Sequence, residues 1–352
     1  MSPFADTFEK LNTYLIQHAV EVKDPSLLNG KMGIAVYFFH LARYSHHSSY
    51  QEFAEVLMDD VYTQIQKNKL SSCFGEGLAG IAWAIDHLVQ EQFVEADIDE
   101  VLSEVDDRIY SFLCHSKKIE FGLREGILGY LVYVIIRLKG HKANNKEIDY
   151  VFSQVFVELI NRLSQSIDEK VWRFLEPPFF ALDWDLPICL VLLGEARALN
   201  LYSDKIERMI SCLAPTVLAY TPYQHVHKLF LSLSILHLLR HFDLPQWKQH
   251  AITILSHFDA EALLNKELKE KNLFLANGLA GISFLLNFLN TQLETHLHLS
   301  VAISNKIENS LFLRSQLESE IDKKPNLGLV NGLAGIGLQY LISRQTKVSS
   351  LL

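Results

Sequence analysis

The sequence predicts an all-α protein: an α/α toroid, or barrel, of seven helix pairs with an inner and an outer helical layer. A glycine-centred motif returns about every 50 residues, and such a period is typical of a repeat architecture. Each copy opens a stretch that is apolar nearly all round, and a stretch with one apolar and one charged face follows it. An open solenoid would leave helices of the first kind half exposed to water, so a closed ring is the better solution.

The motif is clearest as Asn-Gly-Leu-Ala-Gly-Ile, which occurs at residues 277–282 and again at 331–336. The first positions of the seven copies, of which the fourth and fifth are degenerate, are Gly30, Gly77, Gly126, Asp185, His225, Gly278 and Gly332. Two glycines three residues apart lie on one helix face and allow backbones to approach closely. We therefore predict crowded helix starts, with Asn29, Asn277 and Asn331 as N-cap residues.

The outer helices are predicted from apolar residues that recur at intervals of three and four, with charges on the opposite face. Examples are residues 50–65, 151–167 and 206–219. With 352 residues, of which 49% are hydrophobic, the chain can bury a large core, and we expect one domain over residues 1–352.

Net charge, apolar runs and cysteine spacing exclude some classes of partner and indicate the cellular compartment. The net charge of −9 argues against nucleic acid or an anionic membrane surface as the main partner. The longest apolar run, residues 130–136, is too short for an integral membrane segment. Four cysteines without paired spacing and an N-terminus without a signal sequence predict a reduced, cytoplasmic protein.

The residues just before the first motif positions should circle one end of the ring, which we call the mouth. In chain order they are Asn29, Glu76, Glu125, Trp184, Gln224, Asn277 and Asn331. The inner helices begin at this end, so it should collect free N–H groups and the positive ends of helix dipoles. A concave mouth of this kind is the expected binding site, and Cys73 lies three residues before one of its members.

Two kinds of chemistry were tested against these residues. No Cys-x-x-Cys and no His-Glu-x-x-His occurs, and on a helix the rings of His225 and His227 point to different faces, so we expect no metal or other cofactor. Acid–base catalysis needs a carboxylate pair or a His–carboxylate pair with separated pKa values. The candidate catalytic residues are Glu76, Glu125, Asp183, Asp185, Tyr223 and His225.

The repeats resemble the lanthionine synthetase C-like family, which includes the cyclases of lanthipeptides. The resemblance rests on GLAGI at residues 77–81, 278–282 and 332–336, on EGILGYLVYVIIRL at residues 125–138, and on the number and spacing of the units. It implies an α/α toroid with a zinc at the mouth, which activates a peptide cysteine for addition to a dehydrated residue.

The chain departs from the family at the positions that the resemblance assigns to zinc. The implied Cys-His of the sixth unit is Ala276-Asn277, and the implied cysteine of the fifth unit falls at Tyr223. The implied His-Gly of the fourth unit corresponds to Trp184-Asp185, and an implied aspartate falls near Cys73. We therefore expect the fold of the family without its zinc and without zinc-dependent cyclase activity.

Three functions remain open. The first is zinc-independent participation in the maturation of a ribosomally made peptide, with a precursor peptide or a peptide-modifying partner bound at the mouth. The second is an enzyme with replaced acid–base chemistry, such as a zinc-free cyclase or a carboxylate-based hydrolase or lyase. The third is a purely structural interaction module. Residues 172–180, with a double proline, are predicted as a packed loop, with a cover over the mouth or a docking surface as alternatives.

Overall fold

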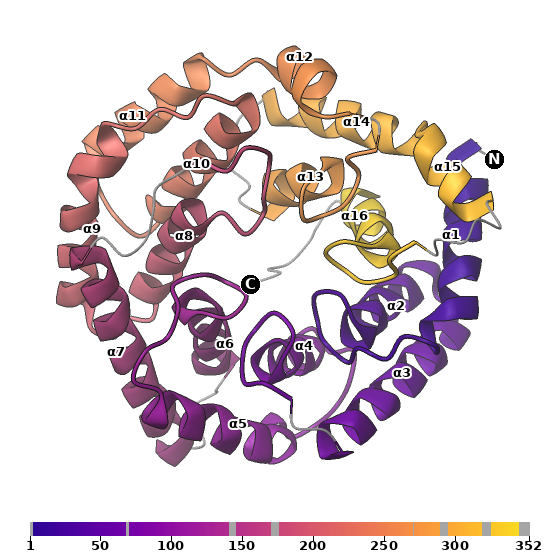
Figure 1. The fold of residues 1–352 in the computed structure, drawn as a ribbon, viewed down its shortest axis with the longest axis horizontal. Coiled ribbons are helices and arrows are strands. Elements are labelled where there is room, and N and C mark those ends of the chain that lie inside the picture. Colours follow the sequence, from indigo (N-terminus) through magenta and orange to yellow (C-terminus); the bar gives the residue numbers. More distant parts are fainter. Residues whose placement is uncertain are drawn as a thin grey trace. The chain divides into compact units, whose positions relative to one another are not determined.

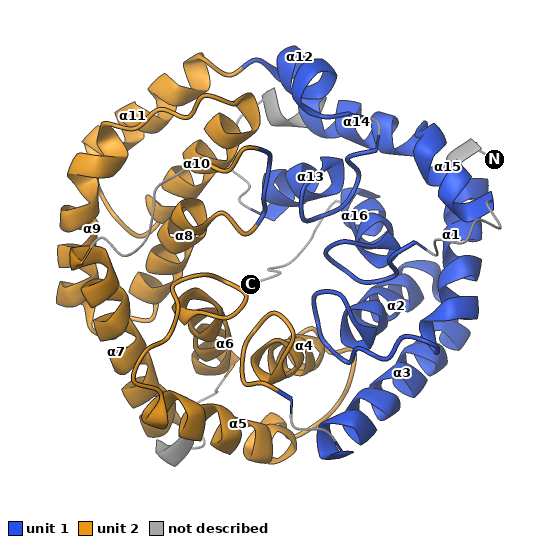
Figure 2. Cartoon of the chain, viewed as in Figure 1, with its two compact units in different colours: residues 1–70, 179–182, 259–351 blue, residues 71–178, 183–258, 352 orange. Residues whose placement is uncertain are grey.

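The computed structural model describes residues 3–67, 70–140, 146–169, 176–269, 271–288, 295–318 and 325–344, and in them only helices, turns and irregular connections occur. The chain divides into two compact units: unit 1 contains residues 1–70, 179–182 and 259–351, and unit 2 contains residues 71–178, 183–258 and 352 (Figure 2). Within the described ranges, no helix is both long and apolar enough to cross a membrane.

Unit 2 contains four inner helices and the outer helices that cover them (Figure 1). The inner helices are α4 (Leu78–Gln90), α6 (Ile127–Gly140), α8 (Asp185–Ala198) and α10 (His225–Leu238). The outer helices are α5 (Ile98–His115), α7 (Lys146–Asp168), α9 (Ser203–Leu218) and α11 (Pro245–Ser256). Each inner helix contacts the next one along the chain, and every outer helix contacts at least one inner helix.

Unit 1 contains three inner helices: α2 (Lys31–Ser45), α13 (Leu279–Phe288) and α16 (Leu333–Arg344). Around them lie α1 (Pro3–Ala19), α3 (Ser48–Lys67), α12 (Ala260–Ala262), the π-helix η1 (Leu263–Glu267), α14 (Thr295–Glu308) and α15 (Leu311–Glu318). Helix α16 packs against both α2 and α13, and α2 packs against α3.

Burial separates the two kinds of helix as the sequence predicts. All residues of α6 from Ile127 to Arg137 are buried, whereas α5 buries only Leu102, Val105, Ile109 and Leu113. The second set recurs at intervals of three and four, so it forms a single stripe on the outer helix. The inner helices thus form the core of each unit, and each outer helix covers them with its apolar side.

Five inner helices each follow a loop with the same hydrogen-bond pattern. In each, the N–H of the first helical residue donates to the carbonyl oxygen seven residues earlier, at 2.8–3.0 Å. The pairs are Lys31 with Asp24, Leu78 with Ser71, Ile127 with Glu120, Leu279 with Asn272, and Leu333 with Asn326. A backbone carbonyl therefore satisfies a group that the start of a helix normally leaves unpaired.

This loop corrects the predicted role of the asparagines. The N-cap residues of α2 and α4 are Gly30 and Gly77, with extended backbone and no side-chain cap. Asn29 stands one position too early, and its side chain instead accepts from Asn331 Nδ2 at 3.1 Å. The prediction of an asparagine N-cap was wrong because the backbone of the loop already caps the helix.

The glycines provide space for this loop. A Cβ at Gly30 would lie 2.4 Å from the oxygen of Asp24, and one at Gly126 would lie 2.4 Å from the oxygen of Glu120. At the second glycine of the motif, a Cβ on Gly129 would lie 2.1 Å from the oxygen of Leu123. The close approach predicted from the motif is present, but its main partner is the loop that precedes each helix.

Neighbouring loops are joined through the residue two positions before the first glycine. In unit 2, Gly75 N–H donates to the Arg124 oxygen at 2.7 Å. In unit 1, Ala276 N–H donates to the Val330 oxygen at 2.8 Å, and Val330 N–H donates to the Leu28 oxygen at 2.7 Å. These bonds tie together the starts of adjacent inner helices within each unit.

Replacing Gly129 with alanine should destabilise the protein. The added methyl would meet the Leu123 oxygen at 2.1 Å and Phe74 Cβ at 2.6 Å. Such overpacking costs about 1–3 kcal/mol or more, which exceeds the gain of up to about 1 kcal/mol from helix propensity. Urea unfolding measures the free energy of unfolding. Gly122→Ala is the matched control, because its nearest contact would be Asp185 Oδ1 at 3.5 Å. Equal stability of Gly129→Ala and wild type would contradict this account of the motif.

Candidate functional site

The predicted mouth residues of unit 2 lie at the N-terminal ends of α4, α6, α8 and α10, and they differ in exposure. The side chains of Glu76, Glu125 and Tyr223 are exposed, and Tyr223 reaches 89% exposure. Five others are partly exposed: Cys73, Asp183, Asp185, Gln224 and His225. In unit 1, Asn277 is exposed, while Asn29 and Asn331 are partly buried and bonded to each other.

Trp184 does not lie at an exposed rim as expected. It is only 4% exposed, and its ring centroid lies 4.9 Å from that of His227 and 6.2 Å from that of Phe230. The large apolar ring fills the core between the starts of α8 and α10. The predicted position of Trp184 at the mouth is therefore corrected, because burying its indole outweighs its place in the repeat.

Two carboxyl groups at the start of α8 have different surroundings. Asp183 Oδ2 accepts from Arg124 Nε at 2.8 Å. Asp185 is the first residue of α8, and no ion pair is found for it in the described chain. Burial, with a smaller contribution from the charge of Asp183, raises the pKa of Asp185 to about 6. One carboxylate is thus paired with a guanidinium, and its neighbour can hold a proton near neutral pH.

A second group lies between the starts of α4 and α6. Burial raises the pKa of the Tyr130 phenol far above its usual value, and the negative charges of Cys73 and Glu125 raise it further. Cys73 Sγ lies 3.0 Å from Ser71 Oγ. Two predicted residues, Cys73 and Glu125, thus act electrostatically on a buried tyrosine that sequence reasoning did not select.

Glu176 is the residue of this region that sequence reasoning missed most clearly. Its carboxylate accepts four hydrogen bonds at 2.8–3.1 Å, from the backbone N–H groups of Tyr223 and Gln224, the Tyr220 hydroxyl and the ring of His227. Burial alone would raise the pKa of Glu176, but these bonds from Tyr223, Gln224 and His227 lower it below its usual value. The carboxylate takes the place of the capping loop at the start of α10.

The same contacts place part of the proline-rich segment. Gln224 Nε2 donates to the Pro178 oxygen at 2.6 Å, so the chain at residues 176–178 is docked on the start of α10. Phe179 follows with 76% exposure, and residues 170–175 lie outside the described residues. The expectation of a packed loop holds for residues 176–178.

His225 and His227 have different neighbours, as predicted from their spacing. His227 is fully buried, and its Nδ1 lies 2.8 Å from Glu176 Oε1. The ring of His225 is partly exposed and lies 6.2 Å from the ring of Phe258. His227 therefore belongs to a His–carboxylate pair in which the histidine is fully buried and Glu176 is 17% exposed.

The residues at the implied zinc positions do not fit a zinc ion. Ala276 has no donor atom in its side chain, and its backbone N–H and oxygen are both used in hydrogen bonds with neighbouring loops. Asn277 and Tyr223 offer an amide and a phenol, which are poor substitutes for imidazole and thiolate. Among the residues that the structure describes, no three His, Cys, Asp or Glu side chains are grouped to hold a metal.

Comparison with known proteins gives a family match over part of the chain and a fold match over most of it. The family described as lanthionine synthetase C-like protein matches residues 21–174. The solved structure of a nisin cyclase matches with a TM-score of 0.67 and 14% identity, over 96% of this chain and 93% of that one. No curated protein matches the sequence. The likeness shows the predicted all-α fold, the α/α toroid. The partial family match and this shared fold confirm that the chain resembles the lanthionine synthetase C-like family, as the repeats predict.

Proposed function

We propose that this protein takes part in the maturation of a ribosomally synthesised, lanthipeptide-type peptide. It binds the precursor peptide, or a partner enzyme that modifies it, at the N-terminal ends of the inner helices, and it does so without zinc. The family match and the nisin cyclase fold support the class of process. We place this function in the cytoplasm, because all four cysteines are free, as is typical of a reducing compartment.

The observation that carries the proposal is the substitution at the implied zinc positions. At one of these positions a tyrosine, Tyr223, stands where the family resemblance implies a cysteine, and its side chain is 89% exposed. The backbone N–H of Tyr223 donates to the Glu176 carboxylate at 2.8 Å. An aromatic side chain on a fixed backbone loses little entropy when a peptide packs on it. Exposed Glu76 and Glu125 add negative charge at the starts of α4 and α6, which favours a peptide with basic residues.

Replacing Tyr223 with alanine should weaken binding of a lanthipeptide-type precursor peptide about tenfold, since exposed aromatic anchors often dominate a peptide interface. Fluorescence anisotropy of the labelled peptide measures the change. Tyr150→Ala, which removes a tyrosine 66% exposed on α7, is the matched control and should leave the affinity unchanged. Adding a chelator should not alter binding, and metal analysis should find no stoichiometric zinc.

Three results would count against this proposal. If zinc is bound at one ion per chain and its removal abolishes peptide binding, the zinc-independent form is wrong. If neither the peptide nor a co-encoded modifying enzyme binds, the process itself is wrong, and a structural interaction module becomes the better explanation. If Tyr223→Ala binds as tightly as wild type, the peptide lies elsewhere.

Asp183 and Asp185 favour a second candidate function, an enzyme with acid–base chemistry. Acid and base roles at neutral pH require two groups with separated pKa values. Arg124 binds Asp183, while burial raises the pKa of Asp185 to about 6. Glu125 stands just before the neighbouring helix α6 and adds an exposed carboxylate. A titratable group kept at the expense of stability is typical of a functional site.

The stability difference between Asp185→Asn and wild type should depend on pH. The folded-state pKa of Asp185 is raised from 3.8 to about 6, so its contribution to stability is largest at low pH and is lost as pH rises through this range. Relative to wild type, the variant should therefore gain up to about 2 kcal/mol between pH 4 and pH 7.5, as measured by urea unfolding, since solvent screens a group that is partly exposed. Asp204→Asn, at an exposed position in the first turn of α9, is the control. A difference that does not change with pH would remove the argument for this acid–base pair.

A further inference from the structure

Unit 2 contains a cavity of about 360 Å³ beside the second half of α6, separate from the residues discussed above. Helices α5, α6 and α7 line it. Its polar wall includes Asp99, Asp106 and Asp107, and its aromatic wall includes Tyr110, Tyr133 and Phe152. A volume of this size accommodates a small organic molecule.

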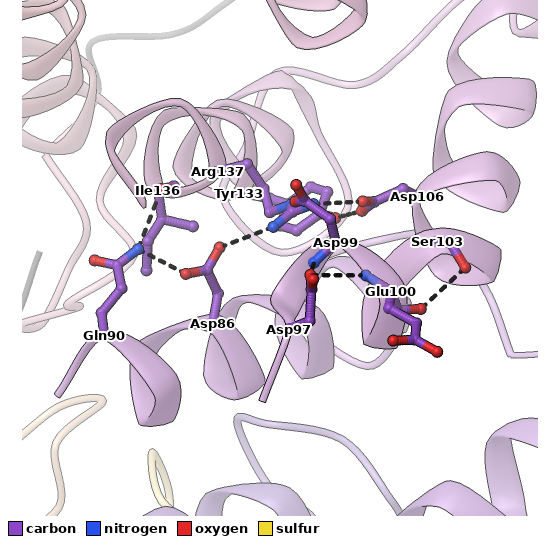
Figure 3. Close-up of polar contacts among 10 residues, drawn as sticks. All are labelled: Asp86, Gln90, Asp97, Asp99, Glu100, Ser103, Asp106, Tyr133, Ile136 and Arg137. Atoms are coloured by element: carbon purple, nitrogen blue, oxygen red, sulfur yellow. Dashed lines mark hydrogen bonds and ion pairs between the residues drawn. The ribbon is translucent and has the colours of Figure 1, made fainter. Parts of the chain in front are cut away.

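Three residues that line the cavity also contact the buried side chain of Arg137. Arg137 is fully buried, and its Nη2 lies 3.0 Å from Asp99 Oδ1 and 2.8 Å from Asp106 Oδ2 (Figure 3). Its guanidinium carbon lies 5.1 Å from the centre of the Phe152 ring. Asp99, Asp106 and Phe152 thus already recognise one guanidinium group from within the core, by paired carboxylates and an aromatic face.

Three carboxyl groups lie around Arg137. Asp86 Oδ2 also lies 3.5 Å from Arg137 Nη1, so three carboxyl groups face one guanidinium. Burial raises the pKa of Asp106 to about 7 despite Arg137, with Asp86 and Asp99 adding to the rise. Asp106 also accepts a hydrogen bond from the Tyr133 hydroxyl. The side chains of Asp99 and Asp106 remain 20% and 15% exposed, and a carboxylate can accept more hydrogen bonds than Arg137 and Tyr133 supply.

We propose that this cavity binds a small organic cation, an alkylguanidinium or alkylammonium ion. The charged head lies against Asp99, Asp106 and Asp107, which form the polar wall of the cavity. The alkyl stem packs against the aliphatic side chains of the cavity, which include Ile109, Leu113 and Val155. Tyr110, which is 45% exposed, forms the aromatic wall at the surface. This site does not depend on the function proposed for the mouth.

Calorimetry on the full chain tests the site with n-butylguanidinium and with n-butylurea, a neutral molecule of nearly the same shape. The guanidinium should bind saturably with one site per chain, and the urea should not. Asp107→Asn and Tyr110→Ala should each raise the dissociation constant about fivefold, by removing a charge and an aromatic face. Neither side chain contacts Arg137 in the structure, so both variants should fold.

Matched controls separate this cavity from general surface effects. Glu104→Gln removes an exposed carboxylate of α5, and Tyr150→Ala removes an exposed tyrosine of α7, and neither residue lines the cavity. Both should bind n-butylguanidinium like wild type. Equal binding of n-butylurea, absence of saturable guanidinium binding, or an affinity that Asp107→Asn and Tyr110→Ala leave unchanged would overturn the proposal.

Discussion

The structure depends on how a helix can begin inside a protein core. The first N–H groups of an α-helix have no partner within the helix, and an unpaired buried N–H is costly. In five units the chain solves this with backbone alone, because the carbonyl seven residues earlier folds back onto the first helical N–H. The loop can come this close only where no Cβ intervenes, as at Gly30 and Gly126. The glycine motif therefore records a packing requirement, repeated wherever an inner helix starts in this way.

The two degenerate units show what replaces the glycines when they are absent. Helix α10 begins without a glycine, and the Glu176 carboxylate takes over the capping of Tyr223 and Gln224 from a distant part of the chain. Helix α8 begins at Trp184 and Asp185, whose side chains are too large for the folded-back loop. At the start of α10, a side chain rather than the backbone thus caps the helix. The candidate residues Asp183, Asp185 and Tyr223 and the Glu176–His227 pair all lie at or beside the starts of these two helices.

Periodicity predicts the helices well and the contacts of individual side chains poorly. Apolar residues all round a segment, or on one stripe of it, report burial directly, so both helical layers could be predicted. The asparagine caps were wrong because Asn29 and its counterparts are favourable cap residues locally, and nothing local shows that a carbonyl already fills that role. Glu176 could not be predicted, since its partners lie more than 40 residues further along the chain. Trp184 was misplaced because its position in the repeat predicts exposure, while its size favours the core.

The same loops explain how this fold can keep its shape while its chemistry changes. Ala276 occupies the position at which the family resemblance implies a metal-binding cysteine. Its N–H donates to Val330 and its oxygen accepts from Leu182, both at 2.8 Å, so the backbone there is held from both sides. Neither bond uses the side chain. A cysteine, an alanine or another small residue at this position would therefore project from the same fixed backbone. Because the scaffold is built from carbonyls and glycines, substitution of the implied ligands removes donor atoms without removing any interaction that holds the helix starts together.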